Sequence, residues 1–248
     1  MKVIEIHSIR RSGHHAFTNW LISNLLNTDG STYYCNYKYT KINDNKVLWV
    51  NEAGLDCAQN RFQIKYTKPE YLFLTYENIN YTEFGTQNPF KKTNINSLIF
   101  TPYLKERCNI TEVIEFTFIR EFWNNFSSLF NLYPNYVNEK DYKEVVQHWV
   151  NYYKLLLKHN LKHNGILFDL WVKDKKYSDK LTQKILGIDN KVEPLNTAGT
   201  GSSFKNSELT LNTLLNRSDQ FTFPTWFLDL VYNDIELTNL LKKQQSLL

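Results

Sequence analysis

The chain has little cysteine, proline and glycine for its 248 residues. Its three cysteines, Cys35, Cys57 and Cys108, share no short spacing, and an odd number cannot all pair within one chain. This pattern argues against a disulfide framework or a cysteine metal site, and it predicts reduced thiols in a cytoplasmic protein. Eight glycines and six prolines exclude collagen-like and linker-like sequence.

Long apolar runs and a strong excess of one charge are also missing. No apolar run reaches the ~18 residues of a membrane-spanning helix, and the opening residues, MKVIEIHSIRRSGHH, lack the apolar core of a signal peptide. We therefore expect neither membrane insertion nor secretion. The formal net charge is only +4 and is spread along the chain, which disfavours a nucleic-acid-binding protein and suits a small anionic ligand better.

Core-forming residues, in contrast, are abundant. Hydrophobic residues make up 42% of the chain and aromatic residues 15%, which excludes a disordered protein and is enough for one full core. We expect a single domain over residues 1–248. Lysine outnumbers arginine 23 to 6, so the positions of the few arginines are informative. Arg10 and Arg11 share one short loop, and Arg120 ends an apolar run.

Short β-rich runs alternate with amphipathic helical patterns along the chain, which predicts an α/β domain with a mostly parallel sheet. Residues 44–105, although they include two of these runs, are irregular, and we expect them to hold insertions over the sheet edge. The predicted strands cover residues 2–7, 33–39, 46–50, 71–76, 113–119 and 165–170, and the predicted helices cover 14–27, 122–132, 142–159, 178–186, 208–215 and 224–243.

The segment from His7 to His15, HSIRRSGHH, joins the first predicted strand to the first helix. A glycine-containing loop at a helix N-terminus offers backbone N–H groups to an anion. A nucleotide-hydrolysing loop of the form G-x-x-x-x-G-K-[ST] is not present, because Ser8 replaces the first glycine and His14 and His15 replace the lysine and the hydroxyl residue. Without that hydroxyl there is no obvious Mg²⁺ ligand, so kinase or phosphohydrolase chemistry is disfavoured.

The same loop resembles the 5′-phosphosulfate loop of sulfotransferases, which reads [KR]-S-G-[ST]-[ST]. Arg11-Ser12-Gly13 match that pattern and His14-His15 depart from it, while R-S-G-H-H-A-x-x-N-W looks like a bacterial and phage-type subgroup. The resemblance implies a three-layer sandwich with a central mostly parallel sheet, the P-loop NTPase-like architecture of sulfotransferases. It also implies 3′-phosphoadenosine 5′-phosphosulfate as the donor, with its 5′ end held by residues of the loop: Arg10, Arg11, Ser12, Gly13, His14, His15 and Ala16.

Two later segments extend the resemblance. Sulfotransferases place an arginine at the end of a central strand and a serine eight residues later, both on the 3′-phosphate, and Arg120 and Ser128 have this spacing. A glycine-rich loop near the C-terminus resembles the same subgroup and implies further donor contacts from Gly201, Ser202, Ser203, Phe204 and Lys205, with Arg217 beyond it. The segment Phe168-Asp169-Leu170-Trp171 also looks like that subgroup but receives no chemical role.

The implied reaction moves a sulfuryl group to a hydroxyl or amine of a carbohydrate or small molecule, without a metal. Arg11 would stabilise the charge that builds on the bridging oxygen, while the two loop histidines and Glu52 are candidates for the general base, with Glu77 behind them. His14 and His15 could instead cap the helix or contact solvent. The alternative functions are a P-loop nucleotide kinase or phosphohydrolase, and a non-catalytic nucleotide-binding relic of the fold.

Overall fold

The computed structural model describes residues 1–30, 32, 39–42, 46–51, 69–77, 109–132, 142–159, 165–198 and 210–248. Glu52 and the predicted donor loop 201–205 lie outside these ranges, as do all three cysteines. Within the ranges, no helix is both long enough and apolar enough to cross a membrane.

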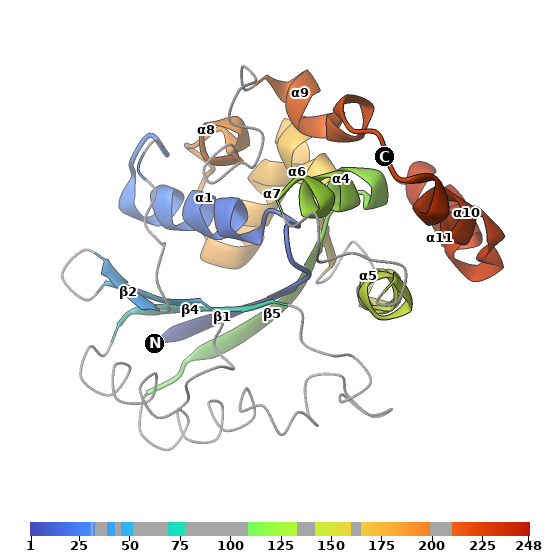
Figure 1. Cartoon of the computed structure of the whole chain (residues 1–248). Coiled ribbons are helices and arrows are strands. Elements are labelled where there is room, and N and C mark those ends of the chain that lie inside the picture. Colours follow the sequence, from blue (N-terminus) through green and yellow to red (C-terminus); the bar gives the residue numbers. More distant parts are fainter. Residues whose placement is uncertain are drawn as a thin grey trace.

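A six-stranded sheet in the order β2-β3-β4-β1-β5-β6 forms the centre of the molecule (Figure 1). The five strands from β3 to β6 in this order run parallel, and β2 pairs antiparallel with β3 at one edge. The first strand of the chain is central, between β4 and β5, as in a sheet wound in both directions from β1. The strands are β1 (Lys2–Ser8), β2 (Tyr39–Ile42), β3 (Val47–Asn51), β4 (Tyr71–Glu77), β5 (Glu112–Ile119) and β6 (Gly165–Leu167).

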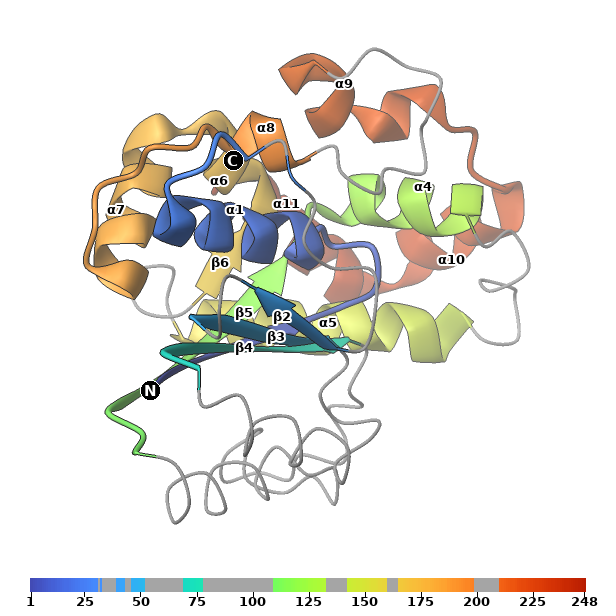
Figure 2. The same cartoon turned by 90° about the vertical axis from the view of Figure 1, so that its left-hand side faces the viewer.

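Helices cover both faces of the sheet. The helices α1, α6, α7 and α8 lie over one face, and α5 lies on the other (Figure 2). α4 follows β5 at the carboxyl edge of the sheet, with α10 and α11 beside it. The helices are α1 (His14–Leu26), α4 (Phe122–Leu132), α5 (Tyr142–His159), α6 (Phe168–Lys173), α7 (Lys175–Leu186), α8 (Pro194–Ala198), α9 (Leu211–Leu215), the 3₁₀ helix η3 (Arg217–Gln220), α10 (Thr225–Asn233) and α11 (Ile235–Gln245).

Alternating side chains of the strands build two cores. On β5, Phe116 and Phe118 pack under α1 in the first core, whereas Ile119 joins the second core with Trp149 of α5. Aromatic side chains dominate both cores, and Phe17 of α1 stacks on Phe118 with ring centroids 4.9 Å apart. This three-layer arrangement with a mostly parallel sheet confirms the predicted fold class.

The boundaries differ from the predicted ones at three places. The predicted strand 165–170 is only three residues long, because Phe168 already begins α6. The predicted helix 224–243 is two helices, because Asp234 interrupts it and caps α11 by accepting a hydrogen bond from the Leu237 N–H at 2.9 Å. Within the region expected to hold insertions over the sheet edge, β4 is an inner strand between β3 and β1.

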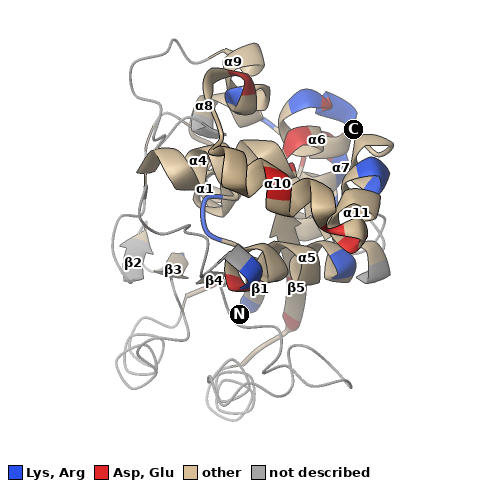
Figure 3. Cartoon of the chain, turned by 45° about the vertical axis from the view of Figure 1, so that its right-hand side comes forward, with Lys and Arg blue, Asp and Glu red and all other residues tan. Residues whose placement is uncertain are grey.

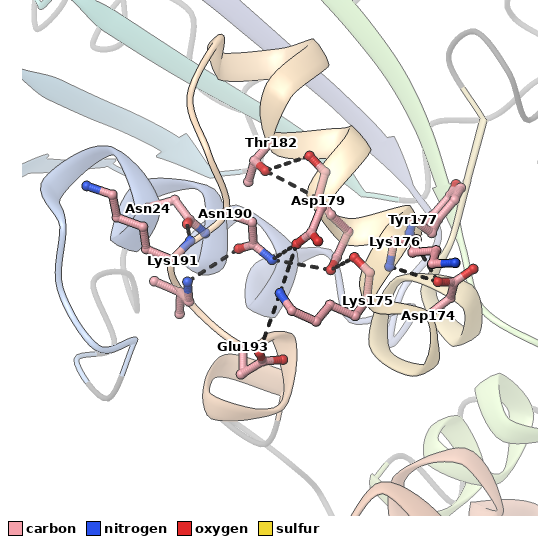
Figure 4. Close-up of polar contacts among 12 residues, drawn as sticks. Asn24, Asp174, Lys175, Lys176, Tyr177, Asp179, Thr182, Asn190, Lys191 and Glu193 are labelled. Atoms are coloured by element: carbon pink, nitrogen blue, oxygen red, sulfur yellow. Dashed lines mark hydrogen bonds and ion pairs between the residues drawn. The ribbon is translucent and has the colours of Figure 1, made fainter.

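A network of polar side chains fixes residues 187–193 between α1 and α7 (Figure 4). Asn190 Nδ2 donates to Asp179 Oδ1 of α7 at 2.9 Å, and the Lys191 N–H donates to Asn24 Oδ1 of α1 at 2.7 Å. The segment leads directly into α8, after which the predicted glycine-rich donor loop follows. The network therefore anchors the chain just before that loop.

Candidate functional site

The loop between β1 and α1 has an unusual backbone. Arg11 and Gly13 both have positive φ angles, of 66° and 94°, and the Ser12 N–H donates to the Ile9 carbonyl at 3.2 Å. α1 begins at His14, and no side chain caps its N-terminus. The first N–H groups of a helix have no partner within the helix, and the helix dipole makes this end attractive to anions. The loop is thus shaped as an anion-binding turn.

Gly13 is required there for two reasons. Its φ of 94° lies in the left-handed region that favours glycine, and a Cβ atom added to it would lie 2.6 Å from Cε2 of Phe168. Real Cβ atoms do not approach a ring carbon so closely. The close packing of this glycine on the Phe168 ring fixes the loop against the start of α6.

Arg120 follows β5 directly, and its side chain is buried near this loop. Its guanidinium lies over the ring of Phe168, 4.5 Å from the centroid, and Nη2 donates to the Leu214 carbonyl of α9. Burial lowers the pKa of Arg120 to about 10, an effect opposed by the charges of Asp169 and Glu121 and reinforced by Arg11. Arg120 therefore remains a cation at neutral pH, in a place where water is largely excluded.

Ser128 lies on α4, two turns after Arg120, and meets the loop after β1. Arg11 Nε donates a hydrogen bond to Ser128 Oγ at 3.3 Å. The spacing of eight residues predicted that Arg120 and Ser128 share a site. Arg11 contacts Ser128, and its charge lowers the pKa of Arg120. Two motifs of the sequence thus form one cluster.

Arg217 of η3 is a third arginine of this cluster, and the sequence analysis gave it no role. Its side chain is buried, and its pKa is lowered to about 9 by burial and then by the charges of Arg120 and Arg11. Asn124 of α4 holds η3 in place, because its Oδ1 accepts from the Ser218 N–H at 3.1 Å. Arginine is rare in this chain, and this rarity was the signal available in the sequence.

Two acidic side chains border the arginine cluster. Asp169 Oδ2 accepts from the Glu121 N–H at 2.8 Å, and Glu121 caps α4 by accepting from the N–H groups of Trp123 and Asn124 at 3.1 and 2.7 Å. Burial raises the pKa of Asp169, and it raises that of Glu121 to about 7. These carboxyl groups hold α4 and α6 together beside Arg120. The raised pKa of Glu121 reduces the negative charge beside the arginines at neutral pH.

The two histidines of the loop differ in environment. His14 is buried, and burial, followed by the charges of His15 and Arg11, lowers its pKa well below the ordinary 6.5, so its ring is neutral at pH 7. Its Nδ1 lies 3.5 Å from Ser12 Oγ. His15 is half-buried, and its ring faces His14 and also Trp49 of β3, with centroids 4.2 and 5.8 Å away. His15 is therefore the more accessible of the two.

Arg10 lies apart from the arginine cluster. Asn125 Nδ2 of α4 donates to its carbonyl oxygen at 3.2 Å. Arg10 lines an open hollow on the other side of the loop, between α4 and α5, together with Ile9, Asn125, Phe126, Leu129, Val145, His148 and Trp149. In Figure 3 the basic stretch of the loop after β1 lies near α4. The two neighbouring arginines therefore serve different surfaces.

Other predicted site residues are placed as follows. Ser12 and Ala16 are buried, and Ala16 packs in the first core. Glu77 is the last residue of β4, but its side chain lies outside what the structure describes, and so do Glu52 and the residues Gly201, Ser202, Ser203, Phe204 and Lys205. The described part of the site therefore comes from β1, α1, β5, α4, α6 and η3.

Comparison with solved structures gives a match over the whole length. The "Sulfotransferase Domain from the Synechococcus PCC 7002 Olefin Synthase" aligns with a TM-score of 0.52 and 11% sequence identity, covering 99% of this chain and 94% of that one. The chain has the fold of a sulfotransferase domain. Neither protein-family models nor curated protein sequences match it.

This fold explains where the motifs meet. The loop after β1 and the Arg120–Ser128 segment after β5 follow adjacent parallel strands, so both lie at the carboxyl edge of the sheet. Ligands of parallel α/β sheets bind at that edge. A helix N-terminus and buried arginines at this edge both favour an anionic ligand.

Proposed function

We propose that this protein is a sulfotransferase that moves a sulfuryl group from 3′-phosphoadenosine 5′-phosphosulfate to a hydroxyl or amine of a carbohydrate or small molecule. The observation that supports this most is the convergence of Arg11, Arg120 and Arg217 with Ser128 at the N-terminal end of α1. The donor carries about four negative charges, since a phosphate monoester contributes close to two. Three partly desolvated arginines would offset most of this negative charge.

The two ends of the donor would use different parts of the site. We assign the 5′-phosphosulfate to Arg11 and the first N–H groups of α1, and the 3′-phosphate to Arg120, Ser128 and Arg217. Charge-assisted hydrogen bonds of buried arginines are stronger than neutral ones, so each arginine adds both affinity and geometry. The 201–205 loop remains assigned to the donor on the resemblance of its sequence.

The chemistry is a balanced displacement at sulfur. A bond forms from the acceptor oxygen or nitrogen to sulfur, the bond from sulfur to the bridging oxygen breaks, and that electron pair leaves on the 3′,5′-bisphosphate. Arg11 would stabilise the developing charge on the bridging oxygen. The acceptor proton passes to a base. We favour His15 or Glu52 over His14 for this role, because protonation of the buried His14 ring would add a positive charge beside that of Arg11.

Phosphoryl transfer is less well supported. In a nucleotide-hydrolysing loop a lysine and a hydroxyl residue hold the γ-phosphate and Mg²⁺, and here their positions carry His14 and His15. A neutral buried His14 supplies no cation there. A non-catalytic relic would keep the same donor site, so binding alone does not separate it from an enzyme. We propose further that the chain acts as one cytoplasmic domain, without a nucleic-acid partner.

Transfer of a radiolabelled sulfuryl group tests the proposal. The protein is incubated with labelled donor and a panel of sugars, phenols and amines, and label in the acceptor is measured. We expect transfer to at least one member of the panel, and transfer slowed by about 10²–10³-fold in the Arg11→Ala variant. Phosphorylation of the same panel with ATP and Mg²⁺, and none with the sulfuryl donor, would contradict the proposal. Tight binding of the bisphosphate with no transfer to any acceptor would indicate the relic.

A further inference from the structure

Phe168 is one ring that touches both ends of the candidate donor site. It is the first residue of α6, directly after β6, and only 1% of its surface is exposed. One side of the ring meets Gly13, where a Cβ atom would lie 2.6 Å from Cε2. Arg120 lies over its face at 4.5 Å from the centroid. The ring therefore separates the turn that leads into α1 from the arginine that follows β5.

The position of this ring is itself fixed from two directions. Trp171 and Phe118 pack against it edge-on, with ring centroids 5.6 and 6.2 Å away. The next residue, Asp169, accepts from the Glu121 N–H at 2.8 Å, which ties the start of α6 to the residue after Arg120. Neither the ring nor the strand end beside it can shift without disturbing buried contacts.

A ring between the two phosphate subsites affects the distance that separates them. A ligand with two phosphate groups joined by a rigid ribose gains from both subsites only when their spacing matches its own, because linked contacts add affinity only if both can form at once. A ligand with one phosphate makes no such demand, because it needs only one subsite. The contacts of Phe168 with Gly13 and Arg120 should therefore affect how well one ligand can occupy both subsites at once, and should affect the affinity of each single subsite much less.

We infer that Phe168 is a positioning residue that sets the spacing between the 5′ and 3′ phosphate subsites and so makes the site selective for nucleotides phosphorylated at both positions. The inference rests on the proposed function, since it takes the donor to bind across these subsites. It gives a role to the Phe168-Asp169 pair and explains why a large aromatic residue lies at the start of a short helix beside two phosphate-binding segments.

Calorimetric affinities of three ligands test the inference: 3′,5′-adenosine bisphosphate, 5′-AMP and 3′-AMP. They are measured for the natural protein, for Phe168→Leu, and for Phe130→Leu on α4 as a matched control. Phe130 is also a buried phenylalanine, and its described ring contacts lie in the second core, with Phe221, Phe223, Trp226 and Phe227. Phe168→Met is the second variant, used if circular dichroism shows that Phe168→Leu does not fold.

We expect the natural protein and Phe130→Leu to bind the bisphosphate about tenfold to a hundredfold more tightly than either monophosphate. In Phe168→Leu this preference should fall to within about threefold, with the monophosphate affinities changed much less. An unchanged preference in the folded variant would overturn the inference, as would an equal loss for all three ligands, which a merely structural role predicts. If the natural protein itself shows no preference, the proposed function fails first and the inference falls with it.

Discussion

Arg11 and Ser128 are 117 residues apart in the chain, and Nε of Arg11 donates a hydrogen bond to Oγ of Ser128 at 3.3 Å. The contact joins the loop after β1 to the helix after β5. It brings together two segments that the sequence assigns to opposite ends of one donor molecule. Arg11 is therefore placed to respond to both ends.

Arg217 should contribute to anion binding although no motif contains it. Arg217→Met removes the charge and keeps most of the volume, and the affinity for 3′,5′-adenosine bisphosphate should fall about tenfold or more. The free energy of unfolding without ligand should rise, because burial and two neighbouring arginines disfavour this cation in the folded state. Titration calorimetry and urea denaturation measure the two effects. Lys180→Ala on α7 removes an equal charge at an exposed place and should change neither quantity.

Gly13→Ala should lower the free energy of unfolding more than Gly187→Ala does. At Gly187, φ is 72° and nothing lies within 4 Å of an added Cβ, so Gly187→Ala costs only backbone strain of about 1–2 kcal/mol. Gly13→Ala adds the collision with Phe168 and should also abolish tight binding of the bisphosphate. Chemical denaturation of the two variants gives the comparison. Equal losses of stability, with ligand binding intact in both, would show that the ring contact is unimportant.

Glu121 gives a pH dependence with a definite sign. Its pKa is about 7 in the folded protein against 4.5 for the ordinary group, so between these values the folded state binds more protons than the unfolded state. Stability contributed by this group is thus fully present below about pH 4.5 and falls, by about 3 kcal/mol, as the pH rises to about 7. Denaturant unfolding from pH 5 to 8 should show a smaller fall in Glu121→Gln than in the natural protein. Identical slopes would refute this environment for Glu121.

Arg11 should matter more for turnover than for donor affinity. In the proposed reaction Arg11 contacts the bridging oxygen more strongly as the sulfuryl group leaves, so Arg11→Ala should slow transfer by about 10²–10³-fold in single-turnover measurements. Arg11→Lys should restore part of the rate, because lysine occupies this position in many sulfotransferases. Arg10→Ala is the matched control, since Arg10 lines the separate hollow between α4 and α5. Similar, mild effects of both alanine variants would mean that Arg11 is not the catalytic cation.

The meeting of the loop after β1 with the Arg120–Ser128 segment could be predicted because its signals are local. The strand, the glycine loop and the helix of residues 2–26 are contiguous, and the spacing from Arg120 to Ser128 is set by two turns of one helix. Because arginine is scarce in this chain, Arg11 and Arg120 were informative positions. These segments follow adjacent strands, so their meeting at one sheet edge follows from the parallel topology.

Arg217 and Phe168 could not be given roles from the sequence, for a physical reason. Arg217 reaches the cluster only because Asn124 binds η3 from α4, a contact between residues about ninety positions apart. Phe168 lies in an apolar run typical of a buried strand, and the helix starts there because α6 packs beside α4 through Asp169. Contacts between residues so far apart in the chain produce no periodic pattern in the sequence.

Titration of the natural protein and of Arg120→Ala with 3′,5′-adenosine bisphosphate, 5′-AMP and ATP with Mg²⁺ tests whether the site recognises a nucleotide through its 3′-phosphate. We expect the natural protein to bind the bisphosphate about tenfold to a hundredfold more tightly than 5′-AMP, because Arg120 gains a charge-assisted contact only from the 3′-phosphate. Arg120→Ala should lose this preference and bind 5′-AMP nearly as before. Equal affinities of the natural protein for bisphosphate and 5′-AMP, or tighter binding of ATP with Mg²⁺, would contradict the proposed function.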